Sequence, residues 1–234
     1  MNEPSFPPLL SGQPVEAQVD PFDTACMQAA LGCDAGLVVY NLGPDVLRAA
    51  MVFAPEVALK DAMAMLPACG VGFQNALGAL APPEVAVHLA WNGRILVNGA
   101  SCGALRAAAS SHDPGAVPDW LVVGFSVPLL PTGDRPGDTP DQTCLYGEGC
   151  AEVEAAALLE SWSKHTLVWI NRWSQDGVEP LHAQWRGLAD KLGEDVEQGG
   201  KSGKFVGVDE HFGMLLRDGE DTHLIPITSL LEDN

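Results

Sequence analysis

Positive charge is scarce in this chain. Its 234 residues include 12 Lys and Arg against 31 Asp and Glu, which gives a formal net charge of −19 at pH 7. An acidic surface repels a phosphate backbone, so we expect no nucleic-acid partner. Apolar residues nevertheless make up 47% of the chain, which is too much for a disordered acidic polymer. The composition predicts a folded protein with one medium domain, or with a larger domain and a small one.

Other familiar signals are missing as well. The N-terminus has no basic segment or cleavage pattern of an export signal, and Pro, Gly or charged residues interrupt the apolar stretches before about 18 residues. The six cysteines form no CxxC pair. We therefore expect a cytoplasmic protein with reduced, inert thiols, no membrane partner and no metal site.

The few cations are unevenly distributed. Residues 1–93 contain only Arg48 and Lys60, and the other ten Lys and Arg lie from Arg94 onward. An N-terminal part with so few cations has little with which to bind phosphate groups.

Hydrophobic periodicity and turn residues predict an α+β protein. Residues 22–32 resemble a short helix, and 57–80 a helix broken around Pro67, Gly70 and Gly72. Asn98-Gly99 is a strong hairpin signal. The predicted strands of this part of the chain are 35–41, 47–53, 85–90, 95–97, 101–109 and 120–127.

The second half begins with a Pro- and Gly-rich surface loop over 131–149. Helices are predicted over 151–173 and 180–192, and Trp162, Trp169 and Trp173 are expected to pack along one helix face. The predicted division is an extended lead-in (1–21), a main domain (22–192), a flexible linker (193–203) and a small, SH3-like, barrel-like β module (204–234).

Three segments carry a family resemblance in the same order. WNGRILVNGASCGAL, from Trp91 to Leu105, resembles the central motif of biotin protein ligases and their lipoate-ligase relatives, K-W-P-N-D-I-x-V-N-G-x-K-x-x-G. VVGFSV at 122–127 is similar to the strand V-V-G-I-G-I-N-V of that family. GVDEHFGMLL at 207–216 is similar to G-I-D-E-x-G-x-L-L in its C-terminal module.

The resemblance implies a mixed sheet flanked by helices, related to class II aminoacyl-tRNA synthetases. It also implies a two-step reaction. A biotin- or lipoate-like acid attacks the α-phosphate of ATP, with Mg2+ as the accompanying ion, and the acyl group then passes to a Lys of a carrier protein. Such chemistry needs cations and aligned donors on phosphate.

The sequence departs from the family at the positions that would bind phosphate. The Arg- and Gly-rich loop between the first two strands is replaced by Asn41–Val46, which contains no cation. Arg94 stands where the motif has Asp, and its two Lys positions fall on Ala90 and Ser101. The active site is therefore predicted to be reduced.

By resemblance, eight residues are candidate ligand-binding residues, with Arg94 or Arg106 taking the anion. Simpler interpretations stay open: Trp91 as a core aromatic, Arg94 as a solvated turn residue, and Asn98-Gly99 as a hairpin turn only. The candidates are Trp91, Arg94, Asn98, Gly99, Ser101, Gly103, Arg106 and Gly124.

Three functions follow from these observations. The first is a biotin/lipoate protein ligase-like enzyme that activates or transfers a small acyl group with a degenerate site. The second is a non-catalytic module with the same fold that binds an acyl ligand, a nucleotide or a carrier protein. The third is a scaffold whose small β module contacts other proteins.

Overall fold

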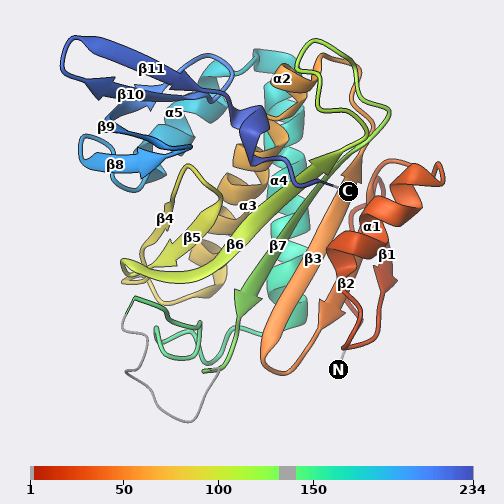
Figure 1. Cartoon of the computed structure of the whole chain (residues 1–234). Helices are drawn as coiled ribbons and strands as arrows, with labels where there is room; N and C mark the ends of the chain where they lie inside the picture. Colours follow the sequence, from red (N-terminus) through yellow and green to blue (C-terminus); the bar gives the residue numbers. More distant parts are fainter. Residues whose placement is uncertain (1–2, 132–140, 234) are drawn as a thin grey trace.

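A seven-stranded sheet forms the centre of the protein (Figure 1). The computed structural model describes residues 3–131 and 141–233. The strands are β1 (Ser11–Pro14), β2 (Leu37–Leu42), β3 (Val46–Phe53), β4 (Val87–Leu89), β5 (Arg94–Val97), β6 (Ala100–Ala109) and β7 (Leu121–Pro128). Their order across the sheet is β1-β2-β3-β7-β6-β5-β4. Only the β1–β2 pair is parallel among these ladders, so the predicted mixed sheet is confirmed.

The expected lead-in contributes the edge strand β1, which the sequence pattern did not reveal. Helix α1 (Pro21–Ala30) connects β1 to β2 and lies on one face of the sheet (Figure 1). Asp20 caps this helix, because its Oδ1 accepts a hydrogen bond from the Phe22 backbone N at 3.0 Å. The cap fixes the position of the Asp20 side chain at the start of the helix.

Two long helices cover the opposite face, α3 (Met65–Leu80) and α4 (Ala155–Asp176). The expected break lies before Pro67, between the single turn α2 (Leu59–Ala62) and α3. Gly70 and Gly72 do not break α3, which corrects the prediction. A Cβ on Gly72 would lie 3.0 Å from the Thr166 backbone N, so this glycine allows α3 and α4 to pack closely.

The packing predicted for the tryptophans of α4 is confirmed. Trp162 is fully buried and its Nε1 donates to the Cys69 carbonyl at 3.1 Å, while Trp169 is 7% exposed. The segment Leu59–Leu80 is long and apolar enough to cross a membrane by length and composition, but most of it is buried inside the protein. Its apolar character is that of a core helix.

The C-terminal residues form a second, four-stranded antiparallel sheet, as expected for a small β module. Its strands are β8 (Asp195–Gln198), β9 (Lys201–Val208), β10 (Met214–Asp218) and β11 (Asp221–Ile225), followed by the short 3-10 helix η1 (Ile227–Leu230). The flexible linker expected over 193–203 is corrected, because β8 and the start of β9 form a hairpin there. Gly199 and Gly200 adopt φ of 57° and 72° at its turn.

Phe212 is one of the residues through which the module packs against the main domain. Phe212, which is 1% exposed, accepts a hydrogen bond at its carbonyl from Trp91 Nε1 at 2.7 Å. Its ring lies 6.1 Å from that of Trp185 on α5 (Glu179–Leu188). Much of the predicted loop 131–149 lies outside the described residues, which resume at Asp141.

The burial of the cysteines leads to a chemical prediction. Burial raises the pKa of the thiols of Cys26 and Cys102 to about 12, whereas Cys33 is only partly buried. A thiol reagent at pH 8 should therefore modify only Cys33 rapidly in the native protein, and all six cysteines in denaturant. Cys33→Ser should remove the rapid phase. Rapid modification of a second thiol would contradict this.

Candidate functional site

A hollow of about 100 Å³ lies between α1 and the face of the sheet that α1 covers. Strand β3 contributes Arg48 to its wall, β6 contributes Arg106, and β7 contributes Gly124 and Ser126. The register explains this grouping, because Arg48 pairs with Ser126 and Arg106 pairs with Gly124. The two arginines are thus two strands apart, about 10 Å between strand axes.

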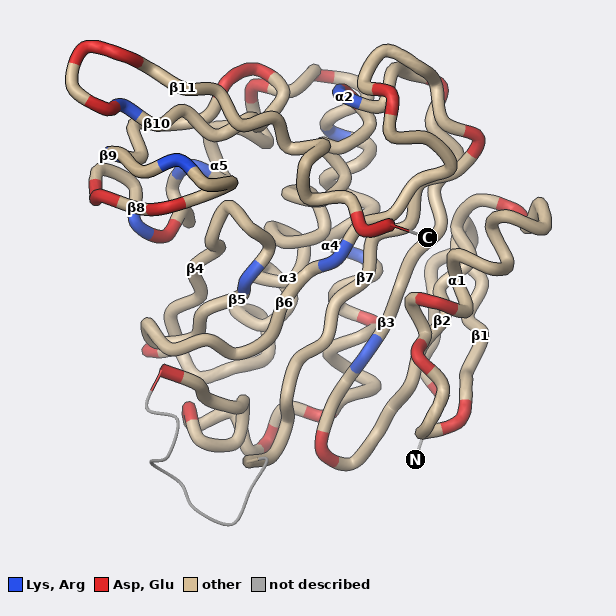
Figure 2. Tube along the Cα trace, in the orientation of Figure 1, with Lys and Arg blue, Asp and Glu red and all other residues tan. Residues whose placement is uncertain are grey.

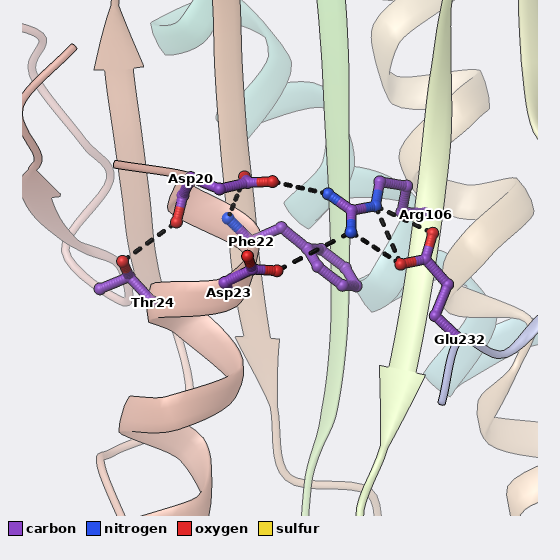
Figure 3. Close-up of polar contacts among 6 residues, drawn as sticks. All are labelled: Asp20, Phe22, Asp23, Thr24, Arg106 and Glu232. Atoms are coloured by element: carbon purple, nitrogen blue, oxygen red, sulfur yellow. Dashed lines mark hydrogen bonds and ion pairs between the residues drawn. The ribbon is translucent and has the colours of Figure 1, made fainter. Parts of the chain in front are cut away.

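Acidic side chains hold the guanidinium of Arg106 on several sides (Figure 3). Its Nε and Nη2 donate to the two carboxylate oxygens of Glu232, Nε to Oε1 at 2.9 Å and Nη2 to Oε2 at 2.7 Å. Its Nη1 donates to Asp20 Oδ2 at 2.7 Å. Asp23 lies further away, 3.8 Å from Nη2. Arg106 therefore binds a carboxylate in the paired geometry that arginine offers to such groups.

These contacts stabilise the charged guanidinium. Hydrogen bonding to Glu232 is the largest influence and raises the pKa of Arg106 above its ordinary value, while burial acts in the opposite direction. Arg106 also lies over the Phe22 ring, with its Cζ 4.2 Å from the ring centroid. Three of its five N–H donors are bonded to carboxylates of the protein, so the charge of Arg106 is already paired.

Gly124 permits the close approach of α1 to the sheet. A Cβ at this position would lie 2.8 Å from Cδ2 of Phe22 and 3.1 Å from the Ala49 carbonyl oxygen. The glycine thus leaves room for the Phe22 ring directly above the strand. This contact forms one wall of the hollow.

Arg48 is the residue of this site that the sequence reasoning missed. It lines the hollow, and no ion pair joins it to another side chain of the described chain. Figure 2 shows few basic positions on the sheet; those on β3, β5 and β6 are Arg48, Arg94 and Arg106. The alternation of side chains along β3 could have indicated the position of Arg48, because Ala50 and Val52 lie on the same face of the strand and pack under α1.

Trp91 and Arg94 lie elsewhere, beside a second pocket of about 250 Å³ at the junction with the C-terminal module. Strand β8 and the segment after α5 complete its wall, with Asp190, Asp195 and Glu197 as acidic members. Trp91 is 5% exposed and its indole N–H donates to the Phe212 carbonyl. This burial agrees with the interpretation of Trp91 as a core aromatic.

Asn98, Gly99 and Ser101 lie at the turn between β5 and β6. Asn98 has φ of 50°, its Oδ1 accepts from the Ala86 backbone N at 2.9 Å, and its Nδ2 donates to Glu148 at 2.8 Å. The Ser101 backbone N donates to the Asp141 carbonyl at 2.9 Å. These contacts are those of a hairpin turn that is hydrogen-bonded to the segment from Asp141 to Glu148.

Gly103 has a packing role. Its φ is 116°, and a Cβ there would overlap the Ser126 carbonyl oxygen of β7. The structure therefore brings Arg106 and Gly124 together with Arg48, and Trp91 together with Arg94, but does not place all eight candidates around one cavity. Within residues 3–131 and 141–233, no group of three or more His, Cys, Asp or Glu side chains is placed to hold a metal ion.

Comparison with protein families gives two matches. A model described as the biotin/lipoate A/B protein ligase family matches residues 6–187. A model for a domain of unknown function (DUF4444) matches residues 192–233. No curated protein matches the chain.

Several solved structures share the fold. A biotin protein ligase-like protein of unknown function from Silicibacter sp. TM1040 is 63% identical, with a TM-score of 0.94 over 98% of this chain and 100% of that one. Biotin protein ligase from Aquifex aeolicus is 17% identical, with a TM-score of 0.72 over 87% of this chain and 91% of that one. The same enzyme in complex with biotin and ATP is 16% identical, with a TM-score of 0.71 over 93% and 95% of the two chains.

Proposed function

Because the chain belongs to the biotin/lipoate A/B protein ligase family, we propose that it binds a small carboxylic acid in the hollow between α1 and the sheet. Arg48 holds the carboxylate in this proposal. One observation supports this proposal: Arg48 lines the hollow, and no carboxylate of the described chain pairs with it.

The chemistry of the hollow suits an acid with an apolar tail. Arginine binds carboxylates through two parallel N–H donors, and this preference grows where water is partly excluded. The Phe22 ring supplies apolar surface to the wall. Phe125 and Ala49 also border the hollow, but their side chains pack into the core on the other face of the sheet. Biotin, lipoate and octanoate are candidate ligands of this type, and biotin is bound by the Aquifex aeolicus enzyme.

ATP and Mg2+ fit these residues poorly. Adenylation develops charge on phosphate and requires several cations around it. The β2–β3 connection supplies none, since residues 41–46 read NLGPDV, and the charge of Arg106 is already paired with Glu232 and Asp20. We therefore propose a binding protein without ligase activity and derive no step through ATP.

Arg48→Met provides the test. It should weaken binding of octanoate or biotin by about 10- to 100-fold, because a charged hydrogen-bonding partner of the carboxylate is lost. Arg94→Met, at the junction pocket, is the matched control and should bind like the wild type. Isothermal titration calorimetry measures the affinity, and thermal unfolding with and without the acid gives a second reading.

Two results would contradict the proposal. The first is loss of binding in Arg94→Met with none in Arg48→Met, which would move the anion site to the junction pocket. The second is pyrophosphate exchange when the wild type receives ATP, Mg2+ and any of these acids. Exchange would establish the alternative, an acyl ligase whose product passes to a Lys of a carrier protein.

A further inference from the structure

A row of four paired residues crosses the sheet from the hollow to the edge of the junction pocket. Arg48 of β3 pairs with Ser126 of β7, and Ser126 pairs with Ala104 of β6. Ala104 pairs in turn with Arg94 of β5. Paired residues of neighbouring antiparallel strands project to the same face of a sheet. The row therefore has an arginine at each end, on the strands β3 and β5 that carry blue positions in Figure 2, and two small residues between them.

This row lies on the accessible face of the sheet. Phe125 and Ile95 precede Ser126 and follow Arg94 in the chain, and both are buried in the core on the opposite face. Ser126 and Ala104 are partly exposed, and Arg94 is exposed. Because the two side chains between the arginines are small, an extended ligand has room to lie along the row.

The two arginines at the ends of the row are not neutralised by the protein. Within residues 3–131 and 141–233, no ion pair joins Arg48 or Arg94 to another side chain, although acidic residues border the junction pocket beside Arg94. Arg106, which lies one row away, differs because carboxylates of the protein already pair with it. The row thus presents two separate positive charges, in a chain whose net charge is −19, and this favours a ligand with two negative groups.

The separation of the two arginines sets the shape of such a ligand. Three steps between neighbouring strands lie between them, about 14 Å between the axes of β3 and β5. One carboxylate cannot contact both arginines at this separation. The hollow, of about 100 Å³, has room for one end of a ligand beside Arg48, and the rest of an extended chain would pass over Ala104 toward Arg94.

We propose that the ligand is a long-chain dicarboxylic acid, with one carboxylate bound by Arg48 in the hollow and the other by Arg94. This inference rests on the proposed function of the hollow and specifies the class of acid. Arginine binds carboxylates through paired N–H donors, so both ends of the diacid are bound in the same way. Because Arg94 is exposed to water, the second contact strengthens binding modestly, but it distinguishes the diacid from a monoacid of the same length.

The first test compares sebacate with decanoate, which has the same chain and one carboxylate fewer. Isothermal titration calorimetry should show about three- to tenfold tighter binding of sebacate to the wild type. Glutarate and pentanoate form the matched short pair. Glutarate cannot reach both arginines, so the ratio of their affinities measures the advantage that two identical ends give by chance alone.

Two variants locate the second carboxylate. Arg94→Met should remove the advantage of sebacate and leave the affinity for decanoate unchanged. Lys191→Met is the matched control, because it removes a positive charge from the wall of the junction pocket at a position outside the row. It should bind both acids like the wild type. Added salt should narrow the difference between sebacate and decanoate in the wild type, since the second contact is exposed.

The outcomes separate this inference from the proposed function. In the wild type, an affinity ratio for the long pair equal to that for the short pair would overturn the diacid and leave the binding site in the hollow standing. An equal loss of sebacate binding in Lys191→Met and Arg94→Met would also overturn it, because Arg94 would have no particular place in binding. Failure of both long acids to bind the wild type would overturn the proposed function and the inference with it.

Discussion

Replacing Gly103 with alanine is expected to lower the free energy of unfolding by about 3–5 kcal/mol. Two costs add at this position. The φ of 116° lies outside the range that alanine adopts readily. In addition, the new methyl group would overlap the Ser126 carbonyl oxygen and lie 3.1 Å from the Val127 Cα, so β6 and β7 would have to separate. Urea denaturation followed by circular dichroism measures the change.

Gly99→Ala separates these two costs. Gly99 also has a positive φ, 89°, but a Cβ there has no neighbour within 4 Å. Its replacement should cost only about 1 kcal/mol, the backbone contribution alone. Similar losses in the two variants would show that the contact between Gly103 and β7 does not carry the effect.

Trp162→Ala should destabilise the protein by about 3–5 kcal/mol, because it empties the largest fully buried side-chain position. The indole contacts the Phe125 ring edge-on, with centroids 4.8 Å apart and an interplanar angle of 66°. Its loss also leaves the Cys69 carbonyl without the N–H donor that now bonds it. Thermal and urea unfolding measure the loss.

Trp173→Ala is the control on the same helix. Trp173 is only partly buried and lines an open groove, so less packing is lost than at Trp162. Its removal should lower the free energy of unfolding by only about 1–2 kcal/mol. Trp162→Phe should recover much of the stability, since most of the apolar volume returns. Equal destabilisation by Trp162→Ala and Trp173→Ala would contradict the central place of Trp162 in the core.

Elements with a strong local signal could be predicted from the sequence, and elements that depend on distant partners could not. The Asn98-Gly99 hairpin and the β7 strand were of the first kind. Strand β1 was of the second kind, because its residues, SGQP, show no apolar alternation and pair with β2 across α1. Strand β8, DVEQ, is equally polar, although Gly199-Gly200 between β8 and β9 was a usable turn signal.

The candidate site shows the same limit. Gly124 could be chosen from its motif and Arg106 as a cation directly after the central motif, and the register places them side by side. The pairing of Arg106 with Asp20 and Glu232 could not be foreseen, since these residues are far apart in the chain and meet only through α1 and the segment after η1. The place of Arg48 depended on β3 lying next to β7, an adjacency that is not local in the sequence.

That adjacency also determines how the sheet must assemble. Every other neighbouring pair in the seven-stranded sheet joins strands consecutive in the chain, whereas β3 and β7 pair residues as distant as Val46 and Pro128. We therefore expect two locally paired halves to form first and this ladder to close late, because long loops cost entropy before their contacts form. Until then, β3 and β7 are unprotected, largely apolar edges, and aggregation during folding should begin there.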